Sequence, residues 1–232
     1  MILGLIFGPY WWFAIPGLIL GIYAQIKLTS AYNKYLEVGT RSGATGAQAA
    51  REILDNAGLS NISVEEIGGR LTDHFDPTKQ ALFLSSENFR GNSISAVGVA
   101  AHESGHALQQ QAGYKMFKLR MWLVPATQFA SMAWMGLMLL GLFFSGLGPG
   151  FINIAIGVFS VLTIFQIVTL PVELDASRRA KIQLERLGLV GPAERGPVRE
   201  VLSAAAMTYV AAMVTGVLEL LQLMMIARDD RR

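Results

Sequence analysis

The chain has 232 residues, enough for one domain or two small ones, and 52% of them are hydrophobic against 16% charged. This composition is too apolar for an ordinary soluble domain, and a net charge of only +2 argues against a nucleic-acid-binding protein. Because the sequence contains no cysteine, disulfides, thiolate metal ligands and a cysteine nucleophile are excluded, and a bound metal must be held by His, Asp or Glu.

Four apolar runs each reach the roughly 20 residues that a helix needs to cross a bilayer. They cover residues 2–26, 121–144, 151–170 and 203–227, and a charge occurs in the last alone, at Glu219. The middle two are joined by the short uncharged segment 145–150 and are predicted to form a transmembrane hairpin. We therefore expect a multi-pass membrane protein whose main partner is the lipid bilayer.

Basic residues are distributed unequally between the segments that connect these runs. Residues 27–120 carry ten Lys or Arg and residues 172–202 carry six, whereas the hairpin turn carries none. Because cytoplasmic segments of membrane proteins are enriched in Lys and Arg, this distribution predicts both polar segments on the cytoplasmic side and both termini on the other.

The first polar segment predicts mixed α and β structure. A helix is expected over residues 45–56, where Thr45 and Gln48 have the spacing of a capping box. Residues 61–85 have the composition of short strands separated by turns. The run 81–85 fits either an edge strand, able to pair with an extended substrate, or an ordinary core strand.

The next helix is predicted over residues 93–112 and contains the sequence HESGH. On a helix, His102 and His106 lie one turn apart on the same face and can reach one ion, while Glu103 lies about 100° around the helix and can reach a water on that ion. This is the H-E-x-x-H arrangement, in which two imidazoles bind zinc and the glutamate activates the zinc-bound water. The alternative is a helix with two surface or packed histidines, but histidine is otherwise nearly absent and the flanking residues are small and apolar.

A catalytic zinc site needs a third protein ligand. The candidates are His74 and the carboxylates Glu173 and Asp175, which lie at the start of a helix predicted over residues 171–187. A hairpin of spans that leaves the polar side and returns would bring Glu173 back to the motif helix, so we prefer it; Asp175 would face the opposite side of its helix. The alternative for both acids is that they interact with the helix dipole.

Three segments carry a family resemblance: LTDHFDP (71–77), AAHESGHALQ (starting at 100) and LPVELDASRRA (170–180). Together they resemble the YugP-type putative neutral zinc metallopeptidases, which are small bacterial membrane proteins, and the resemblance covers nearly the whole chain. The order of motif helix, two spans and then a glutamate is also similar to the HtpX-like and CAAX-prenyl membrane proteases, which are gluzincins.

The resemblance implies one zinc ion on His102, His106 and Glu173, with Glu103 as the catalytic base, in a bacterial plasma membrane. One position departs from the HtpX-like pattern, in which an aspartate four residues after the ligand glutamate supports the first histidine. Here that position is Ser177. We expect Ser177, or Asp175 from another direction, to orient His102.

Peptide hydrolysis also needs a group that stabilises negative charge on the carbonyl oxygen. The candidates are Tyr209, His74 and Arg178. Each has a simpler interpretation: Tyr209 as a residue of the interfacial aromatic belt, His74 as a turn residue bonded to an aspartate, and Arg178 as a surface cation.

The sequence thus predicts a mainly α membrane protein with about four transmembrane helices and a small α+β zincin-like metallopeptidase domain. The predicted parts are a first transmembrane helix, a polar region with the motif helix, a transmembrane hairpin, a third-ligand helix with a loop, and a last transmembrane helix with a short tail (1–26, 27–120, 121–170, 171–202 and 203–232). The predicted function is a zinc metalloendopeptidase acting on protein or peptide substrates.

Two alternatives remain open. One is a membrane scaffold or adaptor that retains a structural zinc, and the other is a transporter-like bundle that uses Glu219 in an ion path. The peptidase is favoured because a structural zinc site has no use for Glu103 beside its ligands.

Overall fold

A computed structural model describes residues 10–143 and 149–229 of the chain. Most of the predicted hairpin turn, residues 145–148, therefore lies outside the described residues. The protein is mainly helical and divides into two compact units. A helical unit comprises Met1–Ala24, Leu119–Leu170 and Thr208–Arg232, and a mixed unit comprises Gln25–Lys118 and Pro171–Met207.

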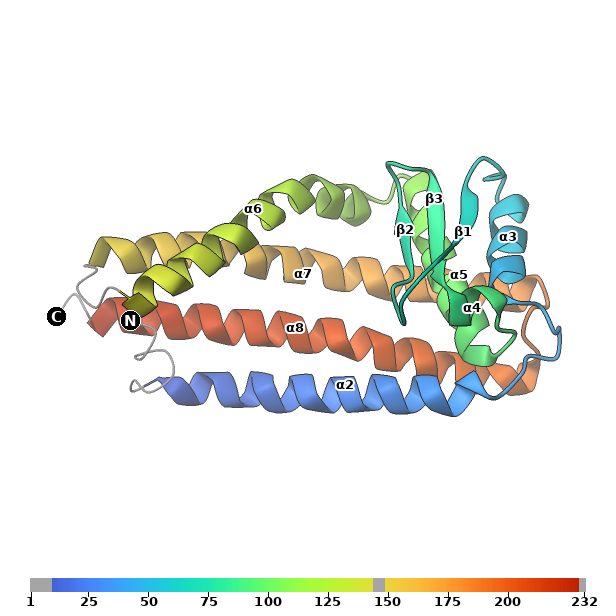
Figure 1. Cartoon of the computed structure of the whole chain (residues 1–232), viewed down its shortest axis with the longest axis horizontal. Coiled ribbons are helices and arrows are strands. Elements are labelled where there is room, and N and C mark those ends of the chain that lie inside the picture. The colour runs from blue at the N-terminus through green and yellow to red at the C-terminus, as the bar shows by residue number, and fades with distance from the viewer. Residues whose placement is uncertain (1–9, 144–148, 230–232) are drawn as a thin grey trace. The chain divides into compact units, whose positions relative to one another are not determined.

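Four long helices supply the apolar segments (Figure 1). By length and composition each can cross a membrane. After the short 3-10 helix η1 (Trp11–Phe13), they are α2 (Ala14–Leu36), α6 (Lys115–Phe143), α7 (Pro149–Arg186) and α8 (Arg195–Asp229). The four predicted membrane-length helices are thus confirmed, and α6, α7 and α8 are longer than the apolar runs that predicted them.

Small residues let helices approach closely within the helical unit. A Cβ on Gly17 of α2 would lie 2.7 Å from the hydroxyl oxygen of Thr215 in α8. The hydroxyl of Thr163 in α7 donates to the carbonyl oxygens of Phe159 and Gly216, at 3.1 and 3.2 Å. Close backbone approach with hydroxyl–carbonyl bonds is how helices associate where burial of apolar surface provides no driving force.

The outer surface of α6 is apolar. Trp122, Phe129 and Met132 are 76%, 74% and 77% exposed. Large apolar side chains in such number are unfavourable in water but are well solvated by lipid chains. This exposure agrees with a location in a membrane.

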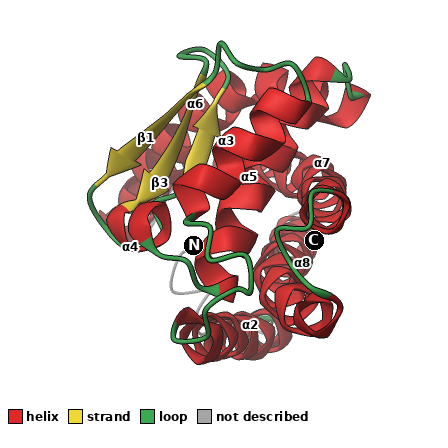
Figure 2. Ribbon diagram, turned by 90° about the vertical axis from the view of Figure 1, so that its right-hand side faces the viewer, coloured by secondary structure: helices red, strands yellow, loops and turns green. Residues whose placement is uncertain are grey.

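The mixed unit contains a three-stranded sheet with the order β1-β3-β2. The strands are β1 (Ser63–Ile67), β2 (His74–Asp76) and β3 (Ala81–Ser85). β1 runs parallel to β3, and β2 runs antiparallel to it on the other side (Figure 2). The run 81–85 is therefore the central strand and largely buried, so its interpretation as an edge strand is wrong.

Two helices of the mixed unit confirm the predicted starts. At α3 (Gly46–Asn56), the N–H of Gln48 donates to the Thr45 hydroxyl at 3.2 Å, and the N–H of Thr45 donates to the Gln48 side chain at 2.9 Å, so the capping box is present. At α5 (Ile94–Gln111), the hydroxyl of Ser93 accepts from the N–H of Ala96 at 3.1 Å. The short α4 (Ser86–Arg90) lies between them.

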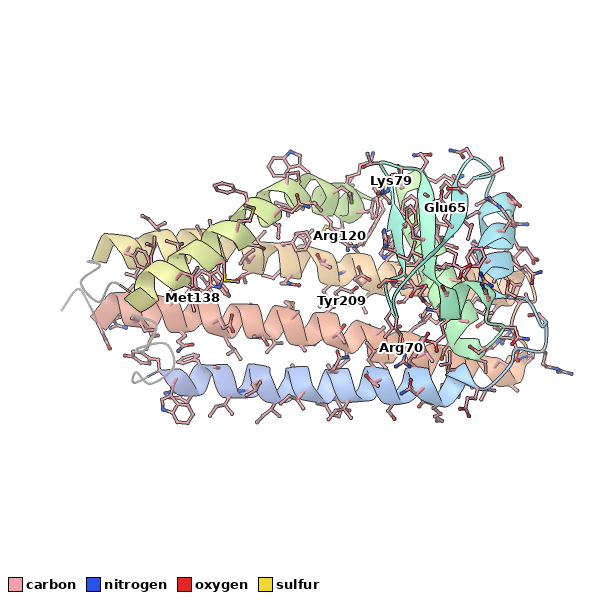
Figure 3. All side chains as sticks on the ribbon, viewed as in Figure 1. Glu65, Arg70, Lys79, Arg120, Met138 and Tyr209 are labelled. Carbon is pink, nitrogen blue, oxygen red and sulfur yellow. The ribbon has the colours of Figure 1, made fainter. Side chains whose placement is uncertain are left out.

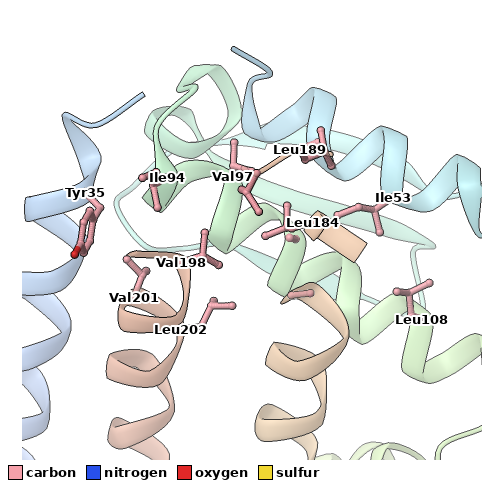
Figure 4. Packing of buried hydrophobic residues seen from close by; sticks show 14 residues of the cluster. Tyr35, Ile53, Ile94, Val97, Leu108, Leu184, Leu189, Val198, Val201 and Leu202 are labelled. Carbon is pink, nitrogen blue, oxygen red and sulfur yellow. The ribbon is translucent and has the colours of Figure 1, made fainter. Parts of the chain in front are cut away.

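The motif helix α5 is buried along most of its length. Its apolar residues share a cluster with α3, α7 and α8 (Figure 4). The labelled members from these four helices are Ile53, Ile94, Val97, Leu108, Leu184, Val198, Val201 and Leu202. A helix held this way cannot rotate about its axis without losing buried apolar contacts, so its polar face has a fixed direction.

Helix α7 runs without interruption through Pro171. The sequence predicted two separate elements, an apolar run ending at 170 and a helix starting at 171, because proline is favoured at helix starts. Pro171 removes one backbone donor, a loss that long membrane helices tolerate. As a result, the predicted third ligand Glu173 lies on the same helix as the third apolar run.

Candidate metal centre

Three predicted ligands come together in the mixed unit. The Nε2 atom of His102 lies 3.1 Å from Oε2 of Glu173, and Nε2 of His106 lies 3.6 Å from the same oxygen. Helix α5 supplies both histidines and α7 supplies the glutamate. Their side chains are 13%, 8% and 2% exposed, so the site is nearly closed to water.

The spacing of these atoms fits a single metal ion. In a tetrahedral zinc site with bonds of about 2.0–2.2 Å, two ligand atoms lie roughly 3.3–3.5 Å apart. The separations of the two Nε2 atoms from Oε2 of Glu173 lie on either side of this range, and all three ligand atoms fall within 4.8 Å of one another. Two imidazoles and one carboxylate form the three-ligand donor set that is typical of catalytic zinc sites, in which water or substrate supplies the fourth ligand.

The second nitrogen of each imidazole also has a partner. Nδ1 of His102 lies 3.1 Å from the hydroxyl oxygen of Ser177, and Nδ1 of His106 lies 3.0 Å from Oε1 of Gln109. Partners on Nδ1 fix the ring orientation and direct Nε2 toward the position of an ion. The predicted contact between Ser177 and His102 is therefore present.

Gly105 determines how closely the two ligand-bearing helices approach. A Cβ at this position would lie 2.5 Å from the carbonyl oxygen of Ala176, which no side chain can accept without a shift of backbone. Ala176 is three residues after Glu173 on α7, so the close approach is one turn from the carboxylate. The absence of a side chain at Gly105 thus lets the backbone of α7 approach α5 closely.

Glu103 follows His102 on α5 and is 9% exposed. A carboxylate that is so buried nearly always has a hydrogen-bonding or charged partner. Its position beside a candidate metal ligand is the one that a base acting on a metal-activated water needs.

Asp175 does not take the place of the missing aspartate. Its carboxylate accepts hydrogen bonds from Arg178 and Arg179, both at 2.6 Å, and from Nε2 of Gln109 at 3.0 Å. Asp175 therefore contacts Gln109, the partner of His106, whereas His102 is contacted by Ser177. Gln109 was not predicted from the sequence, although its place one helical turn after His106 could have identified it.

His74 lies on β2 and is exposed. Its Nδ1 is 2.8 Å from the carbonyl oxygen of Thr72, and its ring stacks on Phe83 at 4.9 Å. In the following turn, the N–H of Lys79 and that of Thr78 donate to Asp76 and hold the pKa of that carboxyl below its ordinary value. His74 thus makes local contacts with Thr72 and Phe83, and it is not part of the cluster formed by the three candidate ligands.

The other predicted charge-stabilising residues lie on long helices. Arg178 is paired with Asp175 on α7. Tyr209 lies on α8 in the helical unit (Figure 3). A role of either residue at the carbonyl oxygen stays a prediction.

Comparison with known proteins gives two findings. The model of a family described as "Putative neutral zinc metallopeptidase" matches residues 10–228. The "Putative membrane protease YugP" of Bacillus subtilis (strain 168) is 44% identical over 221 residues, which cover 94% of this chain and 96% of that protein. No solved structure matches.

Proposed function

Because the chain belongs to the putative neutral zinc metallopeptidase family, we propose that it is an integral membrane zinc endopeptidase with His102, His106 and Glu173 as metal ligands. The observation that carries this proposal is the approach of two imidazole Nε2 atoms to one buried carboxylate oxygen. Glu103, next to the first ligand, supplies the catalytic base.

A zinc ion held there would lower the pKa of a water molecule and polarise the carbonyl of the scissile peptide. Glu103 removes a proton from the attacking water, and the water oxygen forms a bond to the carbonyl carbon. The same carboxyl then gives the proton to the nitrogen as the C–N bond breaks. Ser177 holds His102 in place through this sequence.

The substrates are proteins or peptides that reach a site at the membrane. The two polar segments carry most Lys and Arg residues, which favours the cytoplasmic side for this site. Tyr209, His74 and Arg178 are the residues from which we expect a donor to the developing oxyanion.

The test replaces the base by its amide. Glu103→Gln should keep bound zinc but lower peptide hydrolysis by about 10²–10⁴-fold, which is the usual contribution of acid–base catalysis. Hydrolysis of a quenched fluorescent peptide library by the full-length protein in detergent, together with its zinc content, gives both quantities. Glu52→Gln, a change at an exposed carboxylate of α3, is the matched control.

If Glu103→Gln cleaves as fast as wild type, the assigned mechanism is wrong. If wild type binds zinc but cleaves nothing, and cells tolerate Glu103→Gln, the protein is a scaffold with a structural zinc. Membrane proteins that accumulate in cells carrying Glu103→Gln would identify the substrates.

A further inference from the structure

We propose that Gln109 is a positioning residue that fixes the proton of His106 on Nδ1 and so leaves the lone pair of Nε2 for the metal. This inference rests on the proposed function, since it assigns His106 as a ligand. Gln109 lies on α5 one turn after His106 and its side chain is completely buried.

The neighbours of Gln109 determine which way its amide points. Its Nε2 lies 2.7 Å from the carbonyl oxygen of Val172 and 3.0 Å from Oδ2 of Asp175. Because a carbonyl oxygen and a carboxylate both accept and do not donate, the NH₂ group must face α7. Its oxygen then faces His106, where it lies 3.0 Å from Nδ1.

An amide oxygen can only accept a hydrogen bond, so Nδ1 of His106 must carry the proton. In a neutral imidazole the other nitrogen, Nε2, then has a free lone pair, which is the form that binds a metal. The hydroxyl of Ser177 on His102 is less selective, because a hydroxyl can donate or accept. The proton position is therefore set more strictly at His106 than at His102.

Two arginines bind Asp175, the last residue in the series of hydrogen bonds that runs from His106 through Gln109. Arg178 and Arg179 each donate to Asp175 at 2.6 Å, to different carboxylate oxygens. Charge-assisted bonds of this kind keep Asp175 an acceptor toward Gln109. Asp175 thus acts on the metal centre through Gln109 and His106, and not by contact with His102.

Gln109→Met tests the role of the amide, because methionine has a similar length and its thioether is only a weak acceptor for Nδ1. Loss of such a partner of a metal-ligating histidine typically costs 10–100-fold in metal affinity, and we expect a rise of about that size in the zinc dissociation constant. The matched control is Gln111→Met on the same helix, which loses a 2.6 Å bond to the carbonyl oxygen of Ala57. That variant should stay within about twofold of wild type. Both are measured on the full chain in detergent by competition with a chelator.

A spectroscopic measurement distinguishes positioning from a general structural effect. With Co²⁺ in place of zinc, the ring N–H protons of the ligating histidines give shifted NMR signals. In wild type the N–H of His106 is bonded and buried, so its exchange with solvent should be slow. In Gln109→Met this one signal should exchange at least about tenfold faster, while that of His102 should not change.

If Gln109→Met does not fold, a second pair of variants tests the proposal by exchanging the amide of Gln109 and the carboxylate of Asp175. Gln109→Glu retains an acceptor for His106 but places a carboxylate against Asp175, so zinc affinity should fall. Adding Asp175→Asn supplies a donor to the new carboxylate and should recover at least tenfold of the lost affinity. If zinc affinity does not recover in the double variant, the proposed series of hydrogen bonds from Asp175 through Gln109 to His106 is wrong.

The outcomes separate this inference from the proposed function. If wild type binds zinc, Glu173→Gln loses it, and Gln109→Met binds zinc as tightly as wild type with unchanged N–H exchange, this inference alone is wrong. If wild type binds no zinc, the proposed function and this inference both fail.

Discussion

Each histidine of the candidate centre has a different partner on its second nitrogen. His102 meets the hydroxyl of Ser177, at the position where the HtpX-like pattern has an aspartate, and His106 meets the amide of Gln109. A hydroxyl carries no charge and raises the basicity of the ring less than a carboxylate does. The two ligands therefore depend on their supports to different degrees.

We predict that Ser177→Ala weakens zinc binding by about tenfold, the lower end of the range for lost partners of ligating histidines. The cause is the loss of the contact that orients the ring of His102. Chelator competition on the purified protein measures this change. Ser104→Ala is the control, since the buried hydroxyl of Ser104 donates to the carbonyl of Ala100 within α5; equal losses in both variants would show that Ser177 has no specific role.

Among the individual residues, the sequence predicted the three candidate ligands that the structure brings together. The spacing of His102 and His106 places both on one helix face, and the separations from Glu173 agree with that prediction. Gln109 and the pairing of Asp175 with two arginines were not predicted, because they depend on how α7 lies against α5. Sequence spacing within one helix does not contain that information.

For the elements, the crossing of α5 and α7 is the contact on which the candidate centre depends. Gly105 meets the backbone of Ala176 there, one turn from Glu173. A side chain at the crossing would have to displace one helix by moving backbone, since no flexible side chain is available to give way. Such a displacement would separate the carboxylate from both imidazoles.

We predict that Gly105→Ala lowers zinc affinity by at least about tenfold, because helix displacement disturbs ligands and their partners together. Gly98→Ala, on the same helix with open space where its Cβ would lie, is the matched control. It should keep zinc affinity and raise the midpoint of thermal unfolding, since alanine is favoured over glycine in a helix by about 1 kcal/mol. Wild-type zinc affinity in Gly105→Ala would contradict the importance of this crossing.

Local signals predicted the helices of the mixed unit well, because caps and periodicity are properties of neighbouring residues. The capping box at Thr45 and the start of α5 at Ser93 are examples. The central place of β3 was left open, since strand order depends on pairing between distant segments. The continuity of α7 through Pro171 was missed because proline also marks helix starts.

At the scale of the whole molecule, the main feature is a set of four helices that are long and apolar enough to cross a membrane. Exposed residues such as Trp122 and Phe129 on α6 support a lipid environment. The excess of Lys and Arg in the polar segments predicts that these segments lie on the cytoplasmic side.

Because the chain has no cysteine, single cysteines can report sidedness without background. We predict that Thr78→Cys, in the exposed turn between β2 and β3, reacts with a membrane-impermeant maleimide only after the cytoplasmic side is opened. Ser145→Cys, in the predicted hairpin turn, should react in intact cells. The reverse labelling pattern would place the candidate metal centre on the outside.

The central claim is that His102, His106 and Glu173 together hold one zinc ion. The most direct test is the zinc content of the purified full-length protein after equilibration with zinc and removal of the free ion. We expect about one zinc per chain in wild type and in Asp175→Ala, which removes a supporting contact of Gln109 but no ligand. Almost none is expected in Glu173→Gln, because a site with two imidazoles alone lacks the third ligand. Full zinc content in Glu173→Gln, or its loss in Asp175→Ala with Glu173→Gln unaffected, would contradict the account.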